Sequence, residues 1–82
     1  MTCKLVTPDQ LFFEGEVQAV TLPAYLGEIG ILENHAPLVT LLSKGKLLLT
    51  LKDNSPKVYT VEGGIAEVRN NLVSILADHV EA

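Results

Sequence analysis

The sequence contains no tryptophan, and its 82 residues include only two phenylalanines and two tyrosines. Proteins that bind single-stranded nucleic acid stack the bases on aromatic side chains, and few are available here. Positive charge is also scarce, because six lysines and arginines stand against ten acidic residues and are scattered along the chain. Binding to a phosphate backbone needs a concentrated positive face. We therefore expect no nucleic-acid partner.

Only one cysteine is present, Cys3, so the chain can form no internal disulfide. This excludes a small secreted module stapled by disulfides and fits a reducing compartment. Cys3 lies on the predicted first strand, without a local base or pocket motif. A small buried apolar role is therefore favoured over a catalytic one.

Long apolar runs are missing as well. No stretch approaches the roughly 20 apolar residues that span a bilayer. The N-terminus lacks the pattern of a signal peptide, because only two apolar residues separate Lys4 from Thr7-Pro8. We expect a soluble protein that is not secreted and does not insert directly into a membrane, so that any membrane association depends on a partner.

What the sequence does contain is a pattern of short β-strands. Hydrophobic residues make up 48% of the chain, which is too many for a disordered segment. Turn signals recur at about the 8–12-residue spacing of sandwiches and barrels, and no segment holds helical spacing for long. The sequence predicts one all-β domain over residues 1–78, a flattened antiparallel sandwich or barrel of two sheets with about ten short strands. Residues 79–82 are expected to form a loose tail.

Three local features refine this prediction. The alternation of residues 17–22 slips near Ala19, which predicts a bulge or a strand covered on both faces. Gly15 and Gly63-Gly64 predict a strand break and a sharp corner. The pair Asn70-Asn71 predicts a tight hairpin turn, because asparagine accepts a positive φ.

Apolar residues exceed what one small core needs. Leu48, on the outer parity of its strand, and the double-sided apolar strands 17–22 and 38–42 predict exposed apolar surface. Such patches usually mark a partner, whereas a two-sheet sandwich could hide all of them. The sequence leaves both interpretations open.

No catalytic or ligand-binding motif is recognisable. His35 and His79 are the only histidines, and neither has zinc-ligand spacing with a cysteine or the other histidine. No serine stands in a nucleophile elbow. The run Gly27-Glu28-Ile29-Gly30 lacks the spacing of a phosphate-binding loop. We expect no catalytic residue, no metal and no cofactor.

The least generic stretch is residues 27–38, in which Ile29 and Ile31 share one strand face and Glu28 points to the other. Together with its flanking motifs, this stretch resembles the N-terminal β-sandwich domain of the epsilon subunit of rotary F-type ATP synthases. The resemblance is carried by Thr7-Pro8 through Phe13-x-Gly15-x-Val17, Gly27-Glu28-Ile29-Gly30-Ile31-Leu32-x-x-His35-Ala36-Pro37-Leu38, Gly63-Gly64-Ile65-x-Glu67-Val68 and Asn71-x-Val73-x-Ile75-Leu76-Ala77-Asp78.

The resemblance implies two five-stranded antiparallel sheets and a non-catalytic role in a central stalk. In this family the subunit clasps the gamma subunit and sits on the membrane c-ring, so that proton translocation is coupled to ATP synthesis in the alpha/beta head. It also implies a peripheral location on the cytoplasmic face of a bacterial plasma membrane, or on the stromal face of a thylakoid membrane.

Matching positions give candidate contact residues. The c-ring side would be formed by an exposed loop of Gly27, Glu28, Ile29 and Gly30. The gamma side would be formed by Thr7, His35, Ala36, Pro37 and Leu38.

Two features depart from the family pattern. Many members have a Pro-Gly or Pro-Asn pair where this chain has Glu33-Asn34. Members usually continue into a C-terminal helical hairpin, which is absent here, so neither hairpin-type inhibition nor ATP binding is expected. The alternatives are a stand-alone β-sandwich protein-binding module and, less favoured, a small-ligand barrel or enzyme.

Overall fold

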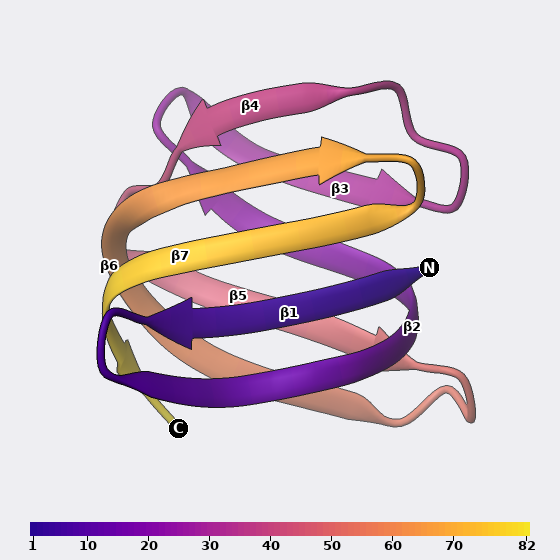
Figure 1. Ribbon diagram of the computed structural model, residues 1–82, viewed down its shortest axis with the longest axis horizontal. Coiled ribbons are helices and arrows are strands. Elements are labelled where there is room, and N and C mark those ends of the chain that lie inside the picture. The colour runs from indigo at the N-terminus through magenta and orange to yellow at the C-terminus, as the bar shows by residue number, and fades with distance from the viewer.

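The computed structural model describes all 82 residues, Met1–Ala82. Every regular element is a strand (Figure 1). The strands are β1 (Thr2–Thr7), β2 (Gln10–Ala24), β3 (Gly27–Leu32), β4 (Leu38–Leu41), β5 (Gly45–Leu51), β6 (Pro56–Arg69) and β7 (Leu72–Glu81).

Three strands are shared between two layers, because β2, β6 and β7 bend and contribute a segment to each (Figure 1). The first layer runs from the start of β2 through β1, β7 and the end of β6 to β4. The second runs from β3 through the end of β2, β5 and the start of β6 to the end of β7. Each layer therefore has five strand segments, which confirms the predicted sandwich. The expectation of wholly antiparallel sheets was wrong in one place, because β1 runs parallel to β7.

The expected strand break and corner are bends inside continuous strands. Gly15 lies within β2, and Gly63 and Gly64 lie within β6. Gly63 and Gly64 have φ angles of 69° and 120°, where side chains are rarely tolerated. Glycine lets β6 pass from one layer to the other without losing its pairing with β7.

The predicted bulge and hairpin turn are both confirmed. The pairing of β2 with β5 shifts between Val17 and Ala19, so Gln18 is the extra residue. Its amide donates to the backbone oxygen of Leu51 at 2.9 Å. Asn70 and Asn71 both have positive φ, as a tight hairpin turn requires.

The core lies between the layers and contains 19 buried residues, all hydrophobic. Strand parity predicted its members well: Ile31, Leu47 and Leu49 are fully buried, and Ile29 packs against them. No buried side-chain polar atom lacks a hydrogen-bond partner.

The loose tail expected from residue 79 is not found. β7 continues to Glu81, and Val80 is buried against the core. Register explains the difference, because Val80 pairs with Val61 and Glu81 with Thr60 at the start of β6. The expectation was wrong because a single apolar residue among polar ones gives little sequence signal.

Candidate interaction surfaces

The outer face of the first layer carries a row of apolar side chains. Val6, Leu76, Ile65 and Leu41 are paired neighbours on β1, β7, β6 and β4, so their side chains project on the same side. Leu41 is 60% exposed, and the others are exposed or half-buried. We call these four residues the apolar row.

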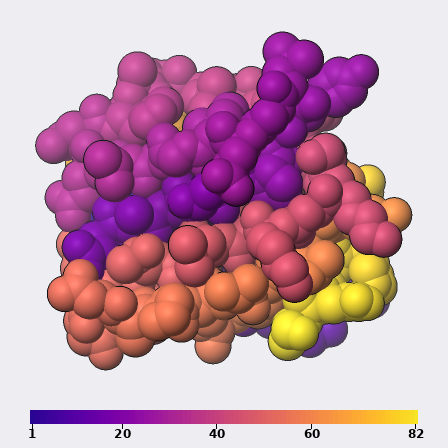
Figure 2. All heavy atoms as spheres, turned by 180° about the vertical axis from the view of Figure 1, so that it is seen from behind, coloured from indigo at the N-terminus to yellow at the C-terminus, as the bar shows by residue number.

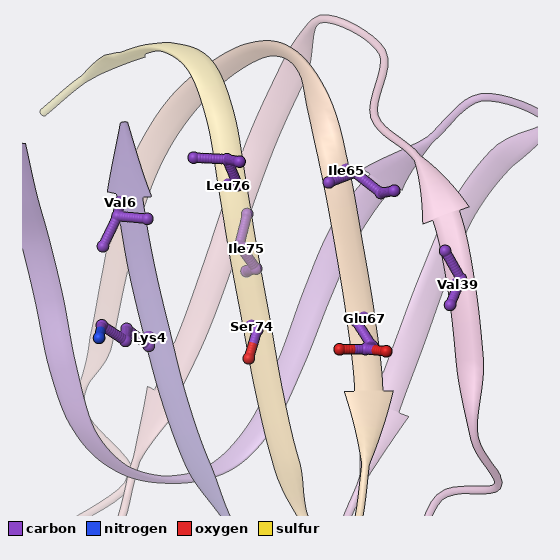
Figure 3. A pocket seen from close by; sticks show the side chains of 8 residues that line it. All are labelled: Lys4, Val6, Val39, Ile65, Glu67, Ser74, Ile75 and Leu76. Carbon is purple, nitrogen blue, oxygen red and sulfur yellow. The ribbon is translucent and has the colours of Figure 1, made fainter. Parts of the chain in front are cut away.

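A second, mixed row runs beside the first. Lys4, Ser74, Glu67 and Val39 are paired neighbours on the same four strands. All members of the two rows except Leu41 line, together with Ile75, a shallow groove of about 260 Å³ (Figure 3). Figure 3 shows Val6, Leu76, Ile65 and Val39 spread across the strands, with Lys4 and Glu67 toward one end. The arrangement is an apolar strip bordered by opposite charges.

Of the strands expected to expose apolar surface, only one does so. Val39 and Leu41 on β4 are 61% and 60% exposed. In residues 17–22, by contrast, every large apolar side chain is fully buried, and Leu48 is half-buried. The bulge at Gln18 explains why residues 17–22 expose no large apolar side chain. The extra residue shifts the alternation of the strand, so that the apolar side chains on both sides of the bulge face inward.

The residues proposed for gamma lie at the two ends of this outer face. Leu38 begins β4 and packs partly against the core. His35 is half-buried and precedes the exposed Ala36 and Pro37 in the connection from β3 to β4. Thr7 lies at the opposite end of β1, where its hydroxyl donates to Asp9 at 2.9 Å. The structure does not bring Thr7 and His35 together, but the apolar row lies between them.

The residues proposed for the c-ring belong to a strand and not to a loop. Gly27 to Leu32 form β3, and Glu28 pairs with Pro23 of β2. The error has a physical cause: glycine favours turns in general, but Gly30 here has ordinary strand geometry. Glu28 is exposed, as expected.

The true loop of this region is the two-residue turn Tyr25-Leu26, which was not among the expected contact residues. Leu26 is 97% exposed and Tyr25 is 67% exposed. The tip of the β2–β3 hairpin projects beyond the body of the molecule (Figure 2). The signal that could have revealed an exposed apolar tip was a pair of apolar residues placed between Pro23 and Gly27, where a turn was expected.

A polar cluster occupies the end of the molecule away from this tip. Lys52 donates to Glu33 at 2.7 Å, and the ammonium of Met1 lies 3.7 Å from the same carboxylate. The hydrogen bond from Lys52, reinforced by its charge, lowers the pKa of Glu33 and raises the pKa of Lys52. Glu16 accepts from the Thr2 hydroxyl at 2.5 Å, which lowers the pKa of Glu16.

Cys3 is fully buried, and burial raises the pKa of its thiol to about 12, so it is no nucleophile at neutral pH. No three His, Cys, Asp or Glu residues are grouped so as to hold a metal ion. The fold has no helix with the length and apolar character needed to cross a membrane.

Comparison with known proteins identifies the family. The model of the ATP synthase delta/epsilon chain beta-sandwich domain matches residues 1–82. The chain belongs to this family. The resemblance carried by residues 27–38 and their flanking motifs is thereby confirmed.

Relatives in the family come from bacteria and from a chloroplast. The ATP synthase epsilon chain of Dichelobacter nodosus is 45% identical over 90% of this chain and 52% of its own length. That of Chlorobaculum tepidum is 39% identical over 96% of this chain and 90% of its own length. The chloroplastic epsilon chain of Tetradesmus obliquus is 38% identical over 95% of this chain and 57% of its own length. The chain thus spans about half the length of some relatives and nearly all of another.

Solved structures agree on the fold. A chain of the Euglena gracilis mitochondrial ATP synthase, solved as OSCP/F1/c-ring, superposes with a TM-score of 0.88 at 28% identity, covering 95% of this chain and 50% of that one. A chain from the central stalk and c-ring of the Tetrahymena thermophila enzyme has a TM-score of 0.80 at 19% identity, covering 96% and 63%. The second match supports the fold alone.

Proposed function

We propose that this chain is a non-catalytic rotor subunit of an ATP synthase, which binds the gamma subunit and the c-ring and so couples proton translocation to ATP synthesis. The observation that carries the proposal is the exposed apolar row of the first layer, in a member of a family of ATP synthase chains. A contiguous apolar strip with charges at its border is the expected form of a protein interface. The chain itself is proposed to contact the alpha/beta head only indirectly.

The gamma subunit is assigned to the outer face of the first layer. Thr7 and the segment His35–Leu38 lie at its two ends, and the apolar row supplies the buried area between them. Lys4 and Glu67 lie beside the row and favour one docking orientation through charge complementarity.

The c-ring is assigned to the projecting β2–β3 hairpin. Glu28 is exposed on β3 next to the tip, and Tyr25 and Leu26 extend beyond it. An acid can pair with basic or amide groups of a partner loop, while the two apolar side chains supply contact area. Gly27, Ile29 and Gly30 shape the strand that presents Glu28. The subunit is peripheral, on the cytoplasmic face of a bacterial membrane or the stromal face of a thylakoid.

The assignment to gamma is tested by titrating the chain with a cognate gamma subunit in a calorimeter. We expect binding, and we expect Leu41→Glu to abolish most of it, because a charge would enter the apolar row. The matched control is Val58→Glu, at a 47% exposed residue outside the first layer, which should bind normally. Absence of binding by the unmodified chain would favour a stand-alone binding module with another partner.

The assignment to the c-ring is tested by Glu28→Ala in the assembled enzyme. We expect an unchanged melting temperature and weaker ATP-driven proton pumping. Glu62→Ala, at an exposed strand acid of the second layer, is the control and should pump normally. Normal pumping together with a large loss of thermal stability would show that Glu28 has a structural role instead.

A further inference from the structure

The connection from β3 to β4 crosses between the two layers with little support from its own backbone. Residues 33–37 contain no strand, and one backbone hydrogen bond, from His35 N–H to Leu32 O at 3.2 Å, closes their turn. Asn34 stands there with a φ of 65°. A connection this sparsely bonded is expected to be mobile unless side chains hold it.

Two asparagine side chains supply that restraint. The backbone N–H of Asn34 donates to Oδ1 of Asn71 at 2.6 Å, and Nδ2 of Asn71 donates to Oδ1 of Asn34 at 3.2 Å. The residues are 37 positions apart, and both have left-handed φ angles. The reciprocal pair joins the β3–β4 connection to the β6–β7 turn, which lie at the same end of the molecule (Figure 1).

Asn71 is itself anchored. Its backbone oxygen accepts the N–H of Thr2 at 2.9 Å, so the β6–β7 turn is fixed to the start of β1. The residue before Asn34 is held separately, because Glu33 accepts a hydrogen bond from Lys52, the residue that follows β5. The pair Glu33-Asn34, which departs from the usual family sequence, is therefore tied to two different elements.

We propose that Asn34 and Asn71 are positioning residues whose reciprocal amide pair fixes the segment His35–Leu38 for partner binding. The role in binding rests on the proposed function, which assigns this segment to the gamma subunit. The restraint on the free chain does not depend on that assignment. Removal of the pair should loosen the connection while leaving the sandwich intact, because the core contains neither residue.

Amide hydrogen exchange of the free chain tests the restraint. Asn71→Gly keeps the backbone freedom that a φ of 60° requires and deletes both hydrogen bonds. We expect the Asn34 amide to exchange about fivefold faster, the factor that corresponds to one net hydrogen bond. Asn70→Gly is the matched control, because it alters the same turn at a φ of 51° without touching the pair.

A conservative variant separates the pair from general damage to the turn. Asn71→Asp keeps the acceptor for the Asn34 N–H but loses the donor, so Asn34 should stay protected. Unchanged exchange in Asn71→Gly would overturn the proposal, as would an equal increase in Asn70→Gly.

Titration with a gamma subunit tests the consequence for binding. We expect Asn71→Gly to bind more weakly than the unmodified chain, and Asn70→Gly to bind equally well. Equal binding by Asn71→Gly, despite faster exchange at Asn34, would overturn the positioning role and leave the proposed function standing. If the unmodified chain does not bind gamma, the proposed function fails, and the exchange experiment still decides whether the restraint exists.

Discussion

Ile31 is the residue of β3 whose side chain is fully buried in the core. We expect Ile31→Ala to lower the free energy of unfolding by about 2–5 kcal/mol, because it removes buried methylenes and leaves a cavity. Urea denaturation measures this loss. Ile65→Ala is the comparison, and because Ile65 is 41% exposed its loss should be clearly smaller. Equal losses would mean that Ile31 is not a core residue in solution.

The ion pair of Glu33 with Lys52 makes the stability of the fold depend on pH. The hydrogen bond from Lys52 lowers the pKa of Glu33 in the folded state. The ionised Glu33 therefore stabilises the fold at neutral pH, and this stabilisation is lost as the pH falls through the lowered pKa. We expect Glu33→Gln to lose less stability than the unmodified chain between about pH 7 and pH 3. Added salt should narrow the difference, because the side chain of Glu33 is 48% exposed.

The control for this prediction is Glu67→Gln, at an exposed acid that forms no ion pair within 4.0 Å. Its denaturation midpoint should depend on pH as that of the unmodified chain does. An identical pH dependence in Glu33→Gln and the unmodified chain would contradict a stabilising pair with Lys52.

At the scale of the element, the bend of β6 depends on Gly64. A Cβ on this residue would lie against the backbone oxygen of Leu76 and only 2.7 Å from Cα of Ala77, and its φ is 120°. We expect Gly64→Ala to destabilise the fold by at least about 1–3 kcal/mol from backbone strain alone. Thermal denaturation followed by circular dichroism measures the effect.

Gly30 provides the contrast within β3. Its φ is ordinary, and nothing lies within 4 Å of the position that a Cβ would occupy. Gly30→Ala should change the free energy of unfolding by no more than about 0.5 kcal/mol. Similar losses of stability in Gly64→Ala and Gly30→Ala would show that neither the positive φ of Gly64 nor its close approach to β7 makes glycine necessary there.

The sequence predicted most elements because their signals are local. Alternation placed Leu47 and Leu49 in the core, and the lost alternation near Ala19 revealed the bulge. The expectations that were wrong concerned features that depend on pairing with residues far away in the sequence. The glycines of β6 look the same whether a strand ends or bends, and only the pairing with β7 decides between the two.

The candidate surfaces were less predictable than the fold. Glu28 was correctly expected to be exposed, but Leu26 was missed because exposure at a turn depends on how far the hairpin projects. The pairing of Asn34 with Asn71 had no sequence signal, since the two residues are far apart in the chain. The apolar row emerges only from the order of β1, β7, β6 and β4.

The whole molecule has one core. Six of the seven strands contribute fully buried side chains to it, and Leu38 of β4 packs against it. We expect a single cooperative unfolding transition. Tyrosine fluorescence, which includes the buried Tyr59, and far-ultraviolet circular dichroism should give the same urea midpoint. Separate midpoints would indicate that the two layers unfold independently, and that the shared strands do not couple them.

The pairing of β1 sets the order of events during synthesis. β1 leaves the ribosome well before its parallel partner, residues 72–76 of β7. Until then β1 can form only its hairpin with β2, and its other edge stays open. Non-local parallel pairing is slow to form. The nascent chain therefore carries an unprotected strand edge until β7 emerges, and during this interval a chaperone would protect it from aggregation.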